Sequence, residues 1–313
     1  MSKCFEISII IPAFQEGPSL LDAIPRILEC AQSASPNVEV LIVDDGSSDN
    51  TWKHTRELVA KYPDVYGIRL SRNYGKDAAI AAGLSQCRGE TAVIIDADLQ
   101  HPPELLAEFY RLWKEDGYQV VEAVKRRRDD EPVLRRMCSR LFGLLAGAFT
   151  PLDLQNSTDY KLLSRPVIEA WKQMGESRLF FRGTIDWLGF RRATVEFDVG
   201  ASLRPVSTWS RLRLLRVAIH ALISYSSAPL RIAHVISFAF LLFGLVLGCE
   251  ALVLKITGRA VSGFTTVIIL LLLVGGAVLG VLGIISEYLA AIYDEVKHRP
   301  RFVIAETVGE RLN

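Results

Sequence analysis

The chain lacks the cysteine pattern of a secreted, disulfide-bonded protein. Its five cysteines are odd in number and widely scattered, and no two of them form a Cys-x-x-Cys pair. We therefore expect neither structural disulfides nor a zinc site, and a reducing cytosolic setting is the default. The first residues also lack a basic stretch followed by a short apolar one, so we expect no signal peptide.

The chain also lacks a dominant charge of one sign. It has 36 Lys and Arg against 35 Asp and Glu, a net charge of +1, so no global basic field predicts nucleic acid as a partner. Hydrophobic residues make up 50% of the 313 residues, too many for an ordinary soluble enzyme, while 23% charged residues are too many for a pure membrane bundle. One soluble domain joined to a small membrane domain fits both values.

Short β-branched runs alternate with helical spacing in the first half of the chain, which predicts an α/β fold with a parallel-rich sheet flanked by helices. The predicted strands are Ile7–Ile11, Val38–Val43, Tyr66–Leu70, Ala92–Ile95 and Gln119–Val124. Further along, we expect strands at Ser157–Leu163 and Ala193–Phe197, a helix at Arg165–Met174 and a basic amphipathic helix at Glu131–Phe149.

Acidic side chains follow three of these strands. Asp96, Asp98 and Gln100 occupy alternate residues after the fourth strand, and alternate residues of extended backbone point the same way. Their oxygens would then converge on one Mg²⁺ or Mn²⁺, the alternative being a solvated loop. Pro12–Gly17 and Asp44–Thr51 follow two other strands. The crevice outside the carboxyl ends of such strands is where nucleotides bind in open α/β sheets.

Two apolar runs near the C-terminus, 232–254 and 260–286, each exceed the ~20 residues needed to cross a bilayer. Basic residues are denser on both sides of this hairpin than within it, so both termini are expected in the cytoplasm. Ser207–Ser227 has an apolar stripe opposite arginines, which predicts a helix at the membrane surface or, alternatively, one covering the soluble core. The expected organisation is a domain over 1–206, an amphipathic helix over 207–229, two spans within 230–290 and a cytoplasmic tail over 291–313.

Gly276 and Gly280 in the second run are spaced for close helix packing. They could pack the hairpin or join subunits of a homo-oligomer, or they could be ordinary membrane glycines.

Three motifs in order give the chain a family resemblance: Ile11–Glu16, Val43–Thr51 and Asp96–Gln100. Together with the two apolar runs, they make the sequence similar to family 2 glycosyltransferases with the GT-A fold. Within that family it resembles polyprenyl-phosphate glycosyltransferases, such as bactoprenol glucosyltransferases and dolichol-phosphate mannose synthases. The Q-x-x-R-W motif of processive polymer synthases does not occur in the sequence.

The resemblance implies a nucleotide-sugar donor. Its base and ribose would be bound by Pro12, Phe14, Glu16 and Asp44, and its diphosphate by a metal on Asp96, Asp98 and Gln100. A core position is the alternative for Phe14, and Asp45 is expected to cap its turn rather than contact a ligand. His101, where the family often has Asp, is expected at the surface.

The acceptor implied by the resemblance is a polyprenyl phosphate in the bilayer, so the site must hold two anions with cations. The positions that match the family's two phosphate-binding arginines are Lys125 or Arg126 and Arg136 or Arg140, the alternative being a solvated basic face or one that binds lipid headgroups. In the segment before the apolar runs, Arg204 and Arg211 are expected to bind the acceptor phosphate. Asp159 matches an aspartate beside the acceptor phosphate and, with Asp98, is a candidate catalytic residue. We expect Asp159 to position Lys161 or an arginine rather than to take a proton.

The expected activity is an inverting, metal-dependent transfer of one sugar to undecaprenyl or another polyprenyl phosphate at the cytoplasmic face of the plasma membrane. UDP-glucose is the preferred donor, with mannose or an amino-arabinose derivative as alternative sugars, because selectivity depends on a few hydroxyl contacts that sequence does not reveal. A non-catalytic, nucleotide-binding membrane scaffold is the alternative from another class. Three metal-facing oxygens argue against it, because a scaffold would not need them.

Overall fold

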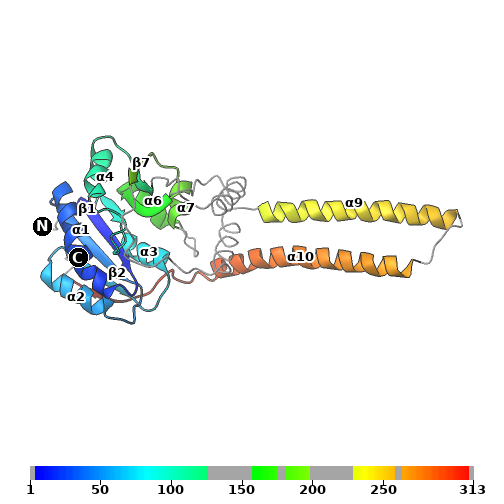
Figure 1. Ribbon diagram of the computed structural model, residues 1–313, viewed down its shortest axis with the longest axis horizontal. Coiled ribbons are helices and arrows are strands. Elements are labelled where there is room, and N and C mark those ends of the chain that lie inside the picture. Colours follow the sequence, from blue (N-terminus) through cyan, green and yellow to red (C-terminus); the bar gives the residue numbers. More distant parts are fainter. Residues whose placement is uncertain (1–3, 126–156, 175–180, 198–227, 258–262, 310–313) are drawn as a thin grey trace. The chain divides into compact units, whose positions relative to one another are not determined.

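The computed structural model describes residues 4–125, 157–174, 181–197, 228–257 and 263–309 (Figure 1). The chain divides into two compact units. The α/β unit comprises Met1–Gly143, Leu152–Ser207 and Arg299–Asn313, and the helical unit comprises Leu144–Pro151 and Thr208–His298. The chain therefore leaves the α/β unit, forms the helical unit and returns.

A mixed eight-stranded sheet forms the centre of the α/β unit, with the order β7-β5-β6-β4-β1-β2-β3-β8. β1 is parallel to β2 and β4, β2 is parallel to β3, and β5 is parallel to β7. β6 is antiparallel to β4 and β5, and β8 is antiparallel to β3. The strands are β1 Ile7–Ala13, β2 Val38–Asp44, β3 Val65–Leu70, β4 Thr91–Ile94, β5 Val120–Lys125, β6 Ser157–Ser164, β7 Arg192–Phe197 and β8 Ile304–Val308.

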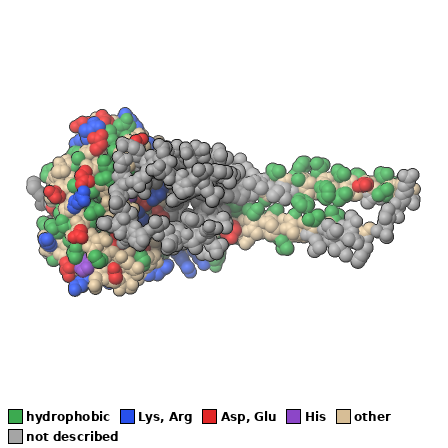
Figure 2. Space-filling model, in the orientation of Figure 1, with side chains coloured by type: hydrophobic (Ala, Val, Ile, Leu, Met, Phe, Trp, Pro, Cys, Tyr) green, Lys and Arg blue, Asp and Glu red, His purple; other side chains and the backbone are tan. Residues whose placement is uncertain are grey.

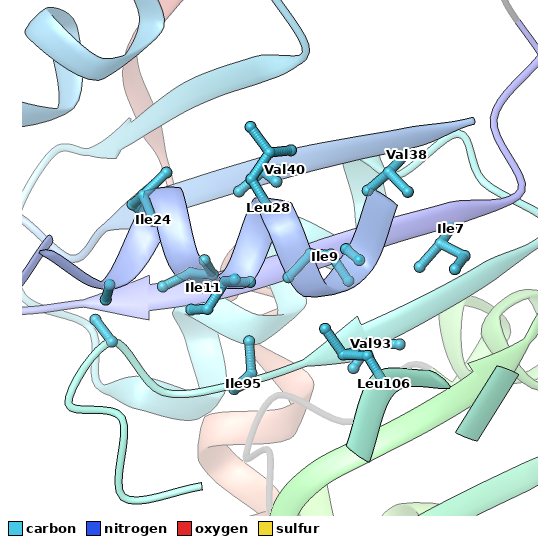
Figure 3. Packing of buried hydrophobic residues seen from close by; sticks show 14 of the residues in the cluster. Ile7, Ile9, Ile11, Ile24, Leu28, Val38, Val40, Val93, Ile95 and Leu106 are labelled. Atoms are coloured by element: carbon cyan, nitrogen blue, oxygen red, sulfur yellow. The ribbon is translucent and has the colours of Figure 1, made fainter. Parts of the chain in front are cut away.

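Helices cover both faces of the sheet, so its central strands are buried on both sides and are rich in Ile and Val. Figure 3 shows Ile9 and Ile11 of β1 in one cluster with Ile24, Leu28 and Val93. Ile10 faces the opposite cluster, with α3 and α6. The helices of this unit are α1 Gly17–Ala34, α2 Thr51–Lys61, α3 Lys76–Gln86, α4 Leu105–Lys114, α6 Arg165–Gln173 and α7 Phe181–Trp187.

The predicted strands and the helix at 165–174 are confirmed to within a few residues. β8 was not predicted, because the sequence analysis left residues 304–308 inside a tail. It is a short edge strand whose residues alternate between half-buried and exposed positions, which is a weak signal in five residues. The amphipathic helices predicted at 131–149 and 207–227 lie outside the described residues.

The helical unit contains α9, Ala228–Ile256, and α10, Phe264–Val296, which contact each other. Hydrophobic side chains lie exposed along both helices, among them Leu241, Leu245 and Leu279 (Figure 2). Among the described residues, one stretch, Leu273–Val296, is long and apolar enough to cross a membrane, and Ser237–Glu250 is a shorter apolar stretch. The two-span hairpin therefore stays a prediction.

Candidate functional site

The loops that follow β1, β2, β3 and β4 all lie at one edge of the sheet, because these four strands are parallel neighbours. This confirms that the three acidic strand ends share an edge. It adds a fourth loop, Ser71–Gly75, which follows β3 and leads into α3.

The turn after β2 is buried and packs closely against the loop after β3. The Asp44 side chain is fully buried, and its Oδ1 accepts a hydrogen bond from the Ser47 backbone N–H at 2.9 Å. Arg69 Nε lies 3.4 Å from Asp44 Oδ2. Gly46 has φ +67°, and a Cβ there would lie 2.7 Å from Arg72 Cα. Only glycine therefore fits this turn.

Asp45 holds the neighbouring loop in place. Its Oδ1 and Oδ2 accept hydrogen bonds from the backbone N–H groups of Tyr74 and Gly75, both at 2.8 Å. Burial raises the pKa of the Asp45 carboxyl, against the effect of these two hydrogen bonds. Asp45 thus has the structural role predicted for it, but it caps the loop before α3 rather than its own turn. This fixes the backbone just before Lys76.

The loop after β1 is tied to the turn after β2. The backbone N–H of Gln15, which has φ 55°, donates to Ser47 Oγ at 3.0 Å, and that of Glu16 donates to Thr51 Oγ1 at 3.0 Å. Pro12 is buried inside β1, whereas the Phe14 ring is 41% exposed and is not a core residue.

The acidic motif after β4 does not have the extended backbone that the alternation argument assumed. β4 ends at Ile94, Ala97 and Asp98 form a turn, and Leu99 has φ 54°. That expectation is wrong because the chain turns away from the sheet within three residues of the strand end. Asp96, Asp98 and Gln100 are nonetheless all half-buried, while Ala97 between them is in the core.

These residues fit a cation that is shared with a diphosphate. Among the described residues, no three His, Cys, Asp or Glu side chains gather as a protein-only metal cage. Mg²⁺ is commonly held by one or two carboxylates together with substrate phosphates. Asp96, Asp98 and Gln100 can provide the protein oxygens for such a site. Asp98 Oδ1 also accepts a hydrogen bond from the Gln100 backbone N–H at 3.1 Å, which orders the turn.

His101 is buried, so its expected surface position is wrong. Its side chain is 8% exposed, its ring lies 5.6 Å from that of Tyr160 and 5.5 Å from that of Phe197, and its Nδ1 is 3.7 Å from Asp96 Oδ2. The histidine therefore packs between two aromatic rings behind the Asp96 carboxylate.

Asp159 of β6 and Asp96 are joined by one ammonium group. Lys76 Nζ lies 2.6 Å from Asp96 Oδ1 and 2.7 Å from Asp159 Oδ2. Arg182 of α7 binds Asp159 through two hydrogen bonds, Nε to Oδ1 at 2.6 Å and Nη2 to Oδ2 at 2.9 Å. Four segments of the chain, α3, the turn after β4, β6 and α7, thus form one ion network at the carboxyl edge of β4.

The network keeps Asp159 ionised. Burial acts to raise the pKa of the Asp159 carboxyl, but the hydrogen bonds from Arg182 and the charge of Lys76 outweigh it and hold the pKa well below its ordinary value. Burial acts to lower the pKa of Lys76, but Asp96 and Asp159 outweigh it and raise this pKa. The carboxylate is therefore a poor proton acceptor and a strong anchor for cations.

Lys161 does not pair with Asp159. Its side chain is fully buried, and its Nζ bonds to Glu122 of the neighbouring strand β5. Of the two kinds of partner proposed for Asp159, the structure has an arginine, Arg182, together with Lys76.

Sequence analysis missed both Lys76 and Arg182. Lys76 could have been found, because it follows a predicted strand at the same sheet edge as the acidic motifs. Arg182 carried no local signal. Among the other predicted phosphate ligands, Lys125 is the last residue of β5. Those outside the described residues are Arg126, Arg136, Arg140, Arg204 and Arg211.

Comparison with known proteins identifies the class. The family description "Glycosyl transferase family 2" matches residues 8–171, which include all of β1 but its first residue, the whole of β2–β4, and Asp159. The chain belongs to glycosyltransferase family 2 and has a GT-A-like α/β fold with a mixed sheet.

Relatives are similar over nearly the whole chain. An uncharacterised glycosyltransferase of Bacillus subtilis, YkcC, is 33% identical over 99% of this chain and 96% of its own length. The undecaprenyl-phosphate 4-deoxy-4-formamido-L-arabinose transferase of Shewanella sediminis is 34% identical over 97% and 93%. The bactoprenol glucosyl transferase of Shigella phage SfV is 29% identical over 96% and 98%. A solved mannosyltransferase of Pyrobaculum calidifontis, in complex with GDP-Man and Mn²⁺, is 20% identical with a TM-score of 0.48, over 95% of this chain and 88% of that one.

Proposed function

We propose that the protein transfers one sugar from a nucleotide-sugar donor to undecaprenyl phosphate or another polyprenyl phosphate. UDP-glucose is the first candidate donor. The observation that carries this proposal is the bridge from Asp96 through Lys76 to Asp159, because it joins the motif expected to hold the donor to the residue expected beside the acceptor. The names of two relatives, a bactoprenol glucosyl transferase and an undecaprenyl-phosphate transferase, support the acceptor class.

The donor half of the site is formed by the ends of β1, β2 and β4. The exposed Phe14 ring can stack on a base, and the buried Asp44 carboxylate can accept a hydrogen bond from one. Asp96, Asp98 and Gln100 would hold Mg²⁺ or Mn²⁺, which would stabilise the negative charge of the departing nucleoside diphosphate. Asp98 acts in catalysis through this contact.

The acceptor half contains Asp159 and Arg182. A phosphate monoester has its second pKa near ~6 and is largely ionised at neutral pH, so its oxygen needs no strong base to attack the anomeric carbon. The bond between the acceptor phosphate oxygen and the anomeric carbon forms as the bond from that carbon to the donor diphosphate oxygen breaks, which inverts the configuration. Asp159 keeps Arg182 and Lys76 in position for two sets of phosphate oxygens rather than accepting a proton.

The route of the chain limits how the helical unit can cross a membrane. β8 follows α9 and α10 and pairs with β3 of the α/β unit, so both ends of the helical unit connect to the same folded unit. A chain that leaves and returns in this way crosses a membrane an even number of times. α9 and α10 therefore both cross, or neither does. An acceptor that gains ~0.8 kcal/mol per buried methylene stays in the bilayer, and a hairpin brings the enzyme to it.

Two other sugars remain as alternatives for the donor, and a non-catalytic scaffold remains as an alternative to an enzyme. Mannose or an amino-arabinose derivative would use the same site with different hydroxyl contacts. A non-catalytic scaffold would bind nucleotide without forming product. The half-buried Asp96 and Asp98 disfavour it, because a scaffold would not need carboxylates aimed at a diphosphate.

The proposal is tested with membranes that contain the full chain, Mn²⁺, undecaprenyl phosphate and a panel of labelled nucleotide sugars. We expect a chloroform-soluble labelled lipid from one donor, its loss in EDTA, and its loss in Asp98→Ala. Asp116→Ala is the matched control, because Asp116 is an exposed carboxylate at the C-terminal end of α4. Nucleotide binding without any labelled lipid from any donor would favour the scaffold.

A further inference from the structure

Lys76 has an unusual position for a residue in a salt bridge, because its ammonium serves both halves of the site at once. Its Nζ is within 2.7 Å of carboxylate oxygens of both Asp96 and Asp159. Asp77 adds a third carboxylate nearby, whose pKa is raised by burial against the hydrogen bond from the Phe181 N–H. The carboxylates of this cluster thus outnumber the charges of Lys76 and Arg182.

The ammonium and a divalent cation compete for the same oxygen atoms. Mg²⁺ and Ca²⁺ bind carboxylate oxygens at ~2.0–2.6 Å, and the Lys76 ammonium already lies 2.6 Å from Asp96 Oδ1. Two cations this close repel each other strongly in a partly buried site. Asp96 can therefore pair fully with Lys76 or with the cation, but not with both.

The local structure lets the side chain move while the backbone stays fixed. The backbone before Lys76 is held by Asp45, through the N–H groups of Tyr74 and Gly75. The Lys76 side chain is 40% exposed, so neighbouring residues do not enclose it on all sides. A lysine has a flexible stem and three donors, so it can change partners without disturbing the core.

Lys76 is not the only positive charge that balances the Asp159 carboxylate. Arg182 donates two hydrogen bonds to it from a planar group, which is the strongest geometry for a carboxylate. Losing Asp96 as a partner therefore leaves Lys76 with Asp159 as its anchor and with N–H donors that can bind another anion.

We propose that Lys76 is a phosphate-binding residue that exchanges partners. Its ammonium pairs with Asp96 until a divalent cation binds that carboxylate, and it then donates to the donor diphosphate while Asp159 retains it. This inference rests on the proposed function for the identity of the diphosphate. In this proposal, Lys76 lowers the affinity of the site for the cation and raises its affinity for the nucleotide.

The test measures two affinities with the full chain in detergent. Mn²⁺ binding is followed by electron paramagnetic resonance without nucleotide, and UDP binding by calorimetry at saturating Mn²⁺. Lys76→Met removes the competing charge, so we expect Mn²⁺ to bind at least threefold more tightly and UDP at least tenfold more weakly. Lys76→Arg keeps the charge and should bind Mn²⁺ about as the wild type does.

Lys53→Met is the matched control, because Lys53 is an exposed lysine on α2 with no ion pair among the described residues. It should change neither affinity. Unchanged or weaker Mn²⁺ binding in folded Lys76→Met overturns the exchange, and so does unchanged UDP binding. If Lys76→Met does not fold, Lys76→Gln takes its place under the same criteria.

The outcome is separable from that of the proposed function. Opposite shifts of Mn²⁺ and UDP affinity in a protein that labels no polyprenyl phosphate would support the role of Lys76 and reject the acceptor. Transfer to polyprenyl phosphate with Mn²⁺ affinity unaffected by Lys76→Met would reject the role of Lys76 alone. No Mn²⁺ binding by the wild type, either without nucleotide or with UDP present, would overturn both metal dependence and exchange.

Discussion

Glu306, in the last strand of the chain, accepts a hydrogen bond from the indole Nε1 of Trp52 at 3.0 Å. Arg56, one turn further along α2, lies 3.2 Å from the other oxygen of the same carboxylate. The carbonyl oxygen of Val303 accepts a hydrogen bond from the N–H of Ser71, at the start of the loop that leads to Lys76. The segment after the helical unit is thus part of the α/β unit and of the frame of its site.

Glu306→Ala should lower the stability of the α/β unit. The substitution removes a half-buried acceptor of one indole hydrogen bond and one ion pair, which together contribute about 1–2 kcal/mol. The measurement is thermal unfolding of the detergent-solubilised chain. Glu57→Ala, an exposed glutamate on the same helix α2, is the control and should leave the melting temperature within error. An equal change in both variants would show that β8 is not held by this carboxylate.

The positions of most strands along the chain and the shared edge of the acidic strand ends were predictable, because strong signals repeat along the chain. Ile7–Ile11 and Val38–Val43 are continuous β-branched runs, and a run of this kind is buried on both faces. The antiparallel strands were harder. Ser157–Ser164 carries Asp159 and Lys161 within its run, and their burial is tolerated only because partners from other elements compensate them.

The site was predictable where its chemistry is contiguous in sequence and hidden where it is assembled in space. Asp96 and Asp98 lie in one motif and could be recognised. Arg182 reaches Asp159 from a seven-residue helix, and no periodicity or spacing encodes that contact. The extended alternation failed because the positive φ of Leu99 belongs to a turn that the residue types do not reveal.

Lys161→Met should destabilise the protein severely. Lys161 is fully buried, and Glu122 is 6% exposed, so removing the lysine leaves a carboxylate buried without its ion-pair partner. Breaking such a pair costs about 3–5 kcal/mol. The double variant Glu122→Gln with Lys161→Met should recover much of this loss, because neither position then carries a charge. Urea unfolding compares the three proteins. A double variant no better than Lys161→Met would contradict this account.

Asp159→Asn should remove stability that the wild type has at neutral pH and loses in acid. The pKa of Asp159 is lower in the folded than in the unfolded chain, where it is near 3.8. The unfolded chain therefore takes up the proton first as the pH falls. The stabilisation is complete well above pH 4 and is lost progressively as the pH falls below that value toward the folded pKa.

Urea midpoints at pH 7, 5, 4 and 3 test this, and Asp159→Asn should show a shallower decline below pH 5. Asp77→Asn is the matched variant in the same cluster. Burial raises the pKa of Asp77 in the folded chain, so the ionisation of Asp77 lowers the stability at neutral pH, whereas the ionisation of Asp159 raises it. Asp77→Asn should be neutral or stabilising at pH 7, and a loss there as large as that of Asp159→Asn would refute the distinction.

Gly46→Ala should cost more than Gly75→Ala. Both glycines have positive φ, +67° and +100°, which an alanine adopts only with strain of about 1 kcal/mol or more. A Cβ on Gly46 also meets the backbone of Arg72 and Asn73, whereas one on Gly75 meets nothing within 4 Å. Unfolding of both variants measures the difference, and UDP binding should weaken in Gly46→Ala. Equal losses would show that strain, and not the packing of the two loops, dominates.

The last prediction concerns the even number of membrane crossings that β8 requires. In a chain whose native cysteines are replaced by alanine, Thr257→Cys lies at the end of α9 and Thr307→Cys is exposed in β8. A membrane-impermeant maleimide added outside intact cells should label Thr257→Cys and should label Thr307→Cys only after permeabilisation. A third chain that retains only the exposed Cys4 should behave as Thr307→Cys does.

The three positions separate the topologies because β8 and β1 belong to one sheet and must share a side. Labelling of Thr257→Cys from outside, with the other two protected, requires α9 and α10 each to cross, even though the described apolar stretch of α9 is short. Protection of all three would mean that neither helix crosses and that the pair lies at the cytoplasmic surface. Labelling of Cys4 from outside would reject the cytoplasmic assignment of the α/β unit, and with it access to a cytoplasmic nucleotide sugar.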